Sequence, residues 1–128
     1  LSQAYYHLSQ YYAYVNIVDK LLENLGKAIE IHRDYMLKYE EVKVFEKSKP
    51  QILAFLTQLK EQKRESATQK LKKAKSYINT LESKGISRFQ NLNAEFQPIK
   101  KKVHLAEMDF QTETYFGFDD CLIKLGSI

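Results

Sequence analysis

The sequence has few of the residues that β-proteins, disulfide frameworks and membrane spans need. Only four Gly and two Pro occur in 128 residues, so few tight turns can form. One cysteine, Cys121, excludes an internal disulfide and favours a reducing compartment. No apolar run approaches the roughly 20 residues that span a bilayer. The first residues also lack the basic start and smooth apolar stretch of a signal peptide. We therefore expect a cytoplasmic protein, with peripheral membrane association as an alternative.

The residues that are abundant predict helices. Hydrophobic residues make up 44% of the chain and charged residues 28%, which suits one globular domain with its own core. Lys, Glu, Gln, Leu and Ala dominate the middle of the chain, and all are strong helix formers. We predict an all-α fold in a single domain, residues 1–128.

The first part of the chain carries a regular apolar pattern, which we call the first seam. Its positions are Ala4, Leu8, Tyr11, Val15, Val18, Leu22, Leu25, Ile29, His32, Met36 and Tyr39. The spacing alternates four and three, as in a coiled coil. Because this phase is unbroken, it predicts one long helix over residues 2–43 that passes through Gly26. Further apolar residues lie beside the seam, so this helix would be central or covered by a second molecule.

A second helix is predicted over residues 49–83. Ser48 and Gln51 form a capping-box pattern, and Pro50 suits the first turn of a helix. The apolar positions that follow are Ile52, Leu56, Leu59, Ala67, Leu71, Ala74, Ile78 and Leu81. Residues 60–66 interrupt them with a polar gap, which we expect to be the most solvated or mobile turn.

A third helix is predicted over residues 88–112. Gly85 suits the left-handed position past a helix end, and Ser87 and Gln90 repeat the capping-box pattern. The apolar positions are Phe89, Leu92, Phe96, Ile99, Val103, Ala106 and Phe110. Since they keep phase across Pro98, a kink is expected there rather than a break.

The tail, residues 113–128, has a different pattern. The run Phe116-Gly117-Phe118 is expected to break the helix, and Asp119 to cap a short last helix through Leu125. The apolar side of this helix would consist of Cys121, Leu122 and Leu125.

These elements predict an antiparallel, coiled-coil-like bundle of three long helices with a short C-terminal helix or tail. In outline, the bundle resembles the three-helix domains of membrane-trafficking proteins and a shortened BAR-type module. The second resemblance implies dimerisation and a basic surface. No motif of either family is present, and we assign no family.

The sequence carries no catalytic or metal-binding signature. His7, His32 and His104 are scattered, without the Glu-x-x-His pairs of di-iron bundles. Cys121 has no neighbouring His and lies next to acidic residues, which do not favour a thiolate. No Gly-rich phosphate loop occurs. We predict no enzyme activity, cofactor, metal site or small-molecule substrate, and we expect His32 to be buried or at an interface.

The charge is unevenly distributed. Residues 50–104 hold twelve basic and four acidic side chains, whereas residues 1–49 are neutral overall and residues 105–128 are net acidic. A predicted anion-binding surface comprises Arg64, Lys70, Lys72, Lys73, Lys75, Lys100, Lys101 and Lys102. An ordinary solvated helix face is the other interpretation.

The sequence also suggests where the lysine clusters lie and where a second surface could bind a partner. Antiparallel pairing about Gly85 would bring Lys70 opposite Lys100, so the lysine clusters would meet. The second surface is predicted because Tyr is enriched at interfaces. Its residues are Tyr5, Tyr6, Tyr11, Tyr12, Tyr14, Ile17 and Leu21.

Three functions follow as hypotheses. The first is a non-enzymatic protein–protein interaction or scaffold module that self-associates as a homodimer or binds a partner helix. The alternative is a peripheral membrane-binding module that uses the lysine surface. The weakest is a nucleic-acid-binding or accessory subunit, because no aromatic side chains for base stacking interleave with the lysines.

Overall fold

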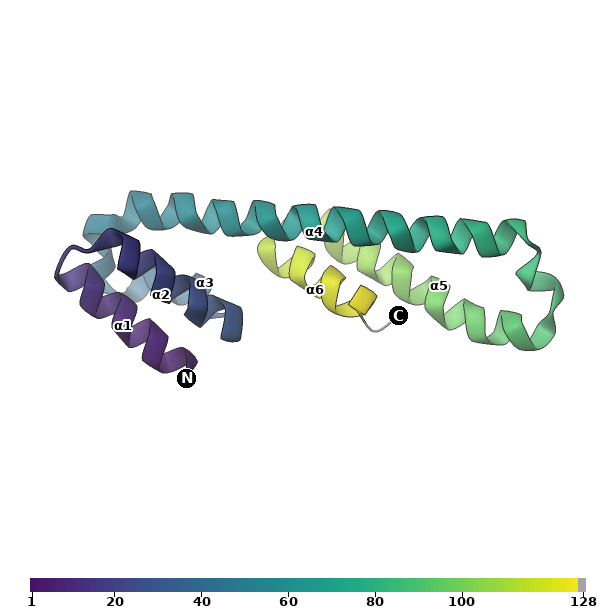
Figure 1. Cartoon of the computed structure of the whole chain (residues 1–128), viewed down its shortest axis with the longest axis horizontal. Helices are drawn as coiled ribbons and strands as arrows, with labels where there is room; N and C mark the ends of the chain where they lie inside the picture. Colours follow the sequence, from purple (N-terminus) through teal and green to yellow (C-terminus); the bar gives the residue numbers. More distant parts are fainter. Residues whose placement is uncertain (127–128) are drawn as a thin grey trace. The chain divides into compact units, whose positions relative to one another are not determined.

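The computed structural model describes residues 1–126, and every regular element in that range is helical (Figure 1). These residues form two compact units. Unit 1 spans Leu1–Gln58, and unit 2 begins at Leu59. The boundary falls inside helix α4 (Lys49–Ser83), directly before the polar gap at residues 60–66. The all-α prediction is confirmed, but the structure has two helical units in place of one bundle of three long helices.

The prediction of one helix over residues 2–43 is wrong. This segment and the residues that follow it divide into α1 (Ser2–Tyr14), α2 (Val18–Ile31), α3 (Tyr35–Lys38) and the 3-10 helices η1 (Tyr39–Glu41) and η2 (Lys43–Ser48). α1 and α2 pack side by side as a helical hairpin (Figure 1). Apolar spacing alone did not reveal these turns, because each short helix keeps the same 3-and-4 period.

A Schellman motif ends α1. Asn16 has a φ of 61°, in the left-handed region that Asn tolerates better than most residues. The Ile17 N–H donates to the Tyr12 carbonyl at 2.9 Å, and the Asn16 N–H donates to the Ala13 carbonyl at 3.2 Å. These bonds satisfy the last carbonyls of the helix and turn the chain back. The second break follows α2, where His32 adopts an extended conformation.

Unit 1 packs around aromatic and aliphatic side chains. The buried apolar residues are Tyr6, Ala13, Leu21, Leu25, Ala28, Ile29, Tyr39, Phe45, Ile52 and Leu56. The Tyr6 ring stacks on Tyr35 with 4.4 Å between centroids, and it meets Phe45 edge-on at 5.9 Å. Gly26 lets α2 approach Phe55, because a Cβ at this position would lie 2.9 Å from Phe55 Cζ. This glycine is therefore a packing position inside a continuous helix.

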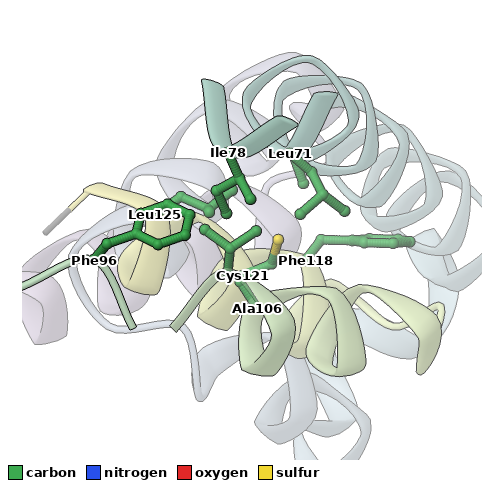
Figure 2. Close-up of a cluster of buried hydrophobic side chains, with 9 residues drawn as sticks. Leu71, Ile78, Phe96, Ala106, Phe118, Cys121 and Leu125 are labelled. Carbon is green, nitrogen blue, oxygen red and sulfur yellow. The ribbon is translucent and has the colours of Figure 1, made fainter. Parts of the chain in front are cut away.

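Unit 2 contains the rest of α4, followed by η3 (Ile86–Arg88), α5 (Gln90–Gln111) and α6 (Tyr115–Gly126). Gly85 follows α4 with a φ of 75°, the left-handed conformation that its position suggests. α5 runs through Pro98 without ending. The three helices share a core of Ala67, Leu71, Ile78, Phe96, Val103, Ala106, Phe118, Cys121 and Leu125 (Figure 2).

The predicted helix break at Phe116-Gly117-Phe118 is wrong, because α6 runs through it. The chain turns earlier, where Glu113 has a φ of 54°. Thr114 then caps α6, since its Oγ1 accepts a hydrogen bond from the Gly117 N–H at 3.0 Å. Gly117 is buried, and a Cβ there would collide with the Asp109 carbonyl oxygen and Thr112 Oγ1. This close approach brings the fully buried Phe118 ring into the core.

Candidate interaction surfaces

α1 buries a different face from the one that the first seam predicts. Its buried residues are Tyr6, Ser9 and Ala13. The seam residues Leu8 and Tyr11 are instead 43% and 58% exposed. The predicted inward orientation is wrong here because the short helix turns its Tyr6 ring towards the aromatic cluster of unit 1. The seam is left on the outside.

The exposed seam residues of α1 form a continuous apolar stripe. We define the α1 stripe as Ala4, Leu8, Tyr11 and Val15, all of them exposed and spaced by four, three and four residues. No Asp, Glu, Lys or Arg occurs among residues 1–18. The stripe is therefore a neutral apolar surface with the spacing of a coiled-coil seam, and Leu8, Tyr11 and Val15 remain 36–58% exposed on it.

The residues predicted for the interface separate into three groups. Tyr6 and Leu21 are buried in unit 1, so they belong to its core rather than to a free surface. Tyr5 and Tyr12 are half-buried. Tyr11 is exposed on the stripe, and Tyr14 and Ile17 are exposed on either side of the turn that joins α1 to α2.

Lys100 does not lie opposite Lys70 as predicted, although Lys75 and Lys100 line one shallow depression together with Glu107. Lys100 Nζ lies 2.6 Å from Glu82 Oε1, so Glu82 rather than Lys70 is its neighbour on α4. The displacement of twelve positions corresponds to about 18 Å along a helix. The reason is that the chain passes from α4 to α5 through η3 and does not pivot at Gly85.

Acidic partners neutralise part of the predicted anion-binding surface. Lys75 Nζ lies 2.5 Å from Glu107 Oε1, and Arg64 lies 3.5 Å from Glu113. Among residues 1–126, four exposed cations of this set have no ion pair, and they are Lys70, Lys72, Lys73 and Lys101. Lys102 is half-buried. The predicted residues thus form separate cationic positions with mixed charge between them, rather than one anion-binding cradle.

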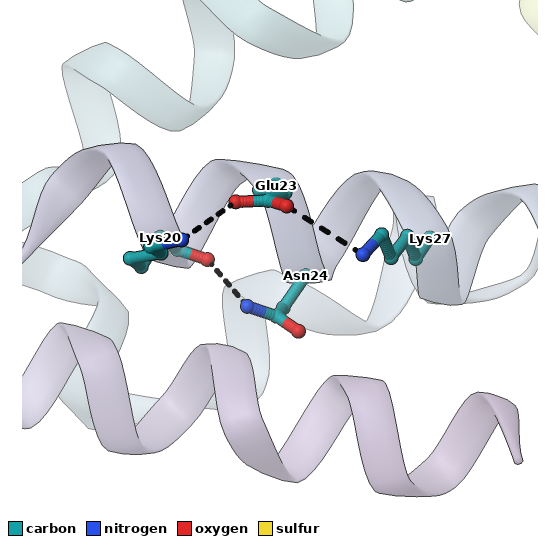
Figure 3. A network of polar contacts seen from close by, with 4 residues as sticks. All are labelled: Lys20, Glu23, Asn24 and Lys27. Atoms are coloured by element: carbon teal, nitrogen blue, oxygen red, sulfur yellow. Dashed lines mark hydrogen bonds and ion pairs between the residues drawn. The ribbon is translucent and has the colours of Figure 1, made fainter.

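A polar network on the exposed side of α2 supports that helix. Glu23 pairs with Lys20 at 3.4 Å and with Lys27 at 3.5 Å, all on α2 (Figure 3). Lys20, and secondarily Lys27, lowers the pKa of the Glu23 carboxyl. Asn24 Nδ2 donates to the Lys20 carbonyl at 2.8 Å. Such one-turn pairs support an exposed helix weakly.

The histidines and the cysteine of the described chain lie apart from one another. No group of three or more His, Cys, Asp or Glu side chains there could hold a metal ion. His32 is exposed, with its Nδ1 3.7 Å from Asp34, so its expected burial is wrong. Cys121 is fully buried, and burial, assisted by Asp109, raises the pKa of its thiol. Within residues 1–126, no helix has both the length and the apolar character to cross a membrane.

Comparisons with protein-family models, with curated proteins and with solved structures found no match for this chain. Its function is therefore argued from the surfaces described above.

Sequence reasoning missed one surface, at the end of the α4–α5 hairpin. Phe89 and Leu92 were assigned to the buried seam of the third helix, but they are 59% and 50% exposed. The lengths of the helices could have indicated this exposed surface. α6 has 12 residues, whereas α4 has 35 and α5 has 22, so α6 cannot cover the hairpin along its full length.

Proposed function

We propose that this protein is a non-enzymatic helical interaction module that self-associates through the α1 stripe. The observation that carries the proposal is the exposure of Leu8 and Tyr11, with Val15 at the C-cap, at coiled-coil spacing along a helix without charged side chains. An amphipathic helix ordinarily buries such a stripe. Association with another helix would remove it from water, and apolar burial is the main driving force for protein association.

A second copy of the chain is the occupant that these features favour. In a two-fold symmetric contact the same patch lies on both subunits, so a charged patch would face its own charge. The α1 stripe avoids this repulsion because residues 1–18 contain no Asp, Glu, Lys or Arg. Tyr14 and Ile17, which are 77% and 46% exposed, could extend the contact beyond the stripe. Tyrosine suits this position because its ring is apolar and its hydroxyl can remain hydrated.

Light scattering after size-exclusion chromatography tests the proposal. The wild-type chain should approach twice its 15.1 kDa mass as concentration rises. The double variant Leu8→Lys/Tyr11→Lys should remain monomeric, because two symmetry-related copies would place like charges in an apolar contact. Leu53→Lys is a matched control, since Leu53 is 45% exposed in unit 1 and lies outside the stripe.

Circular dichroism must show equal helix content in all three proteins. A wild-type chain that stays monomeric at its highest attainable concentration would contradict self-association. If it stays monomeric, the remaining form of the interaction hypothesis is a different partner helix on the same stripe.

A further inference from the structure

Within residues 1–126, no third helix covers the distal end of the α4–α5 hairpin. Gly126, the last described residue of α6, lines one shallow depression together with Tyr77 of α4 and Ile99 of α5. No side chain in residues 79–95 is buried. The fully buried core of unit 2 therefore stops at Ile78 and Phe96, and beyond them only the half-buried Leu81 and Ile86 pack against it.

This hairpin end presents apolar and cationic side chains together. Phe89, between η3 and α5, is 59% exposed, and Leu92, in the first turn of α5, is 50% exposed. Lys84 and Arg88 are exposed beside them, and neither has an ion pair in the described part of the chain. We call Lys84, Arg88, Phe89 and Leu92 the hairpin tip.

Cations predominate at the tip, and the acids Glu82 and Glu95 lie on its two flanks. From residue 83 to residue 94 the chain contains two cations and no acidic side chain. The nearest acid on α4, Glu82, is already paired with Lys100 at 2.6 Å. The N-terminus of α5 adds positive potential, because Phe89 occupies the N-cap position and no side chain accepts a hydrogen bond there. The expected Ser87–Gln90 capping box is accordingly not the cap of this helix.

We propose that the hairpin tip docks on an anionic lipid bilayer, with Phe89 and Leu92 entering the headgroup region and Lys84 and Arg88 contacting lipid phosphates. Aromatic and aliphatic side chains gain by leaving water at this boundary, and cations beside them are attracted to anionic lipids. The two apolar side chains offer little area for a protein interface of ordinary size. A bilayer requires no matching shape, so a small cationic tip suits it better. This binding is independent of the α1 stripe.

The absence of tryptophan from the chain allows a direct test of insertion. Phe89→Trp places the chain's one tryptophan at the tip, and Leu105→Trp places it instead on α5 at a site that is 40% exposed. Vesicles of phosphatidylcholine with about one third phosphatidylserine should shift the Phe89→Trp emission to the blue, whereas pure phosphatidylcholine should not. Leu105→Trp should show no shift with either lipid. An unshifted Phe89→Trp spectrum, or equal shifts at both sites, would overturn the proposal.

Co-sedimentation with the same vesicles measures the apolar and the cationic contributions to binding separately. Phe89→Ser/Leu92→Ser and Lys84→Gln/Arg88→Gln should each weaken partitioning by about tenfold or more. Leu105→Ser/Met108→Ser and Lys43→Gln/Lys47→Gln are the apolar and charge controls, because all four residues are exposed and none belongs to the tip. They should bind as wild type. Wild-type chain that remains in the supernatant, or tip variants that sediment like wild type, would instead leave a protein partner as the occupant.

Discussion

Unit 1 and unit 2 have the same 3-and-4 spacing of apolar residues, but the spaced residues are buried to different extents in the two units. In unit 2 the spacing follows long helices, and Leu71, Ile78 and Val103 are buried as it indicates. In unit 1 the spacing crosses two turns, and Leu8 and Tyr11 remain exposed. Apolar periodicity thus indicates that a segment is helical, but it does not show where a helix turns or which of several apolar faces is buried.

The two units also differ in charge and in their polar contacts. Residues 1–58 hold seven basic and seven acidic side chains, whereas residues 59–128 hold thirteen and nine. Unit 2 has ion pairs that cross between helices, as in Lys75–Glu107 and Lys100–Glu82, besides the Arg64–Glu61 pair within α4. Lys20–Glu23 lies within one helix of unit 1. This contrast matches the two proposals, which assign a neutral apolar contact to unit 1 and a cationic contact to unit 2.

The largest expected effects come from the central phenylalanines, which test whether the units unfold separately. Phe118 is fully buried in unit 2 and Phe45 is 2% exposed in unit 1, so truncation of either to Ala should cost about 3–5 kcal/mol. The measurement is thiol labelling of the buried Cys121 together with circular dichroism. Phe118→Ala should accelerate labelling strongly, and Phe45→Ala should lower overall helix stability with little effect on labelling. Equal acceleration by both would show that the units unfold as one.

Glycine substitutions should have intermediate and unequal effects. Gly117→Ala in unit 2 should lower the free energy of unfolding by about 1–3 kcal/mol or more, because the new Cβ meets the backbone carbonyl of Asp109. In unit 1, the Cβ that Gly26→Ala adds meets only the edge of the Phe55 ring, which can shift. The higher helix propensity of Ala stabilises α2 in compensation. The net effect of Gly26→Ala should lie within about 1 kcal/mol of zero. Urea unfolding curves compare the two, and a larger cost for Gly26→Ala would contradict the packing described here.

The smallest effect is an alkaline pH dependence in unit 1. Burial, with additions from Tyr35 and Glu41, raises the pKa of the Tyr6 phenol above its ordinary value of 10.0. Above about pH 10 the unfolded chain therefore releases this proton while the folded chain retains it, and the free energy of unfolding falls as pH rises. Tyr6→Phe should reduce this fall between neutral pH and pH 11, measured by urea unfolding.

The control for this last experiment is Tyr14→Phe, because Tyr14 is 77% exposed. At neutral pH, Tyr6→Phe should cost little, since the Tyr6 hydroxyl is buried without a hydrogen-bond partner in the described residues. An alkaline slope that is the same in both variants would remove Tyr6 as its source.

Much of the fold was predictable, and the errors have identifiable causes. The α4 and α5 ranges and the left-handed Gly85 follow from periodicity and turn chemistry. The turn at Asn16 had a local signal, an asparagine between apolar residues, but the unbroken spacing outweighed it. The candidate surfaces were less predictable. Tyr6 and Tyr11 are the same residue type on one helix, and only the position of neighbouring rings decides which is buried.

By itself, the sequence determined that this protein is helical, that its first 18 residues are uncharged and that its cations concentrate in the second half. These properties follow from composition and local spacing, which act over a few residues. The tertiary structure decided which face of α1 is exposed, that Lys100 meets Glu82 rather than approaching Lys70, and that Phe89 and Leu92 lie uncovered. Each of these outcomes depends on where distant helices end and how they are aligned, which no local pattern encodes.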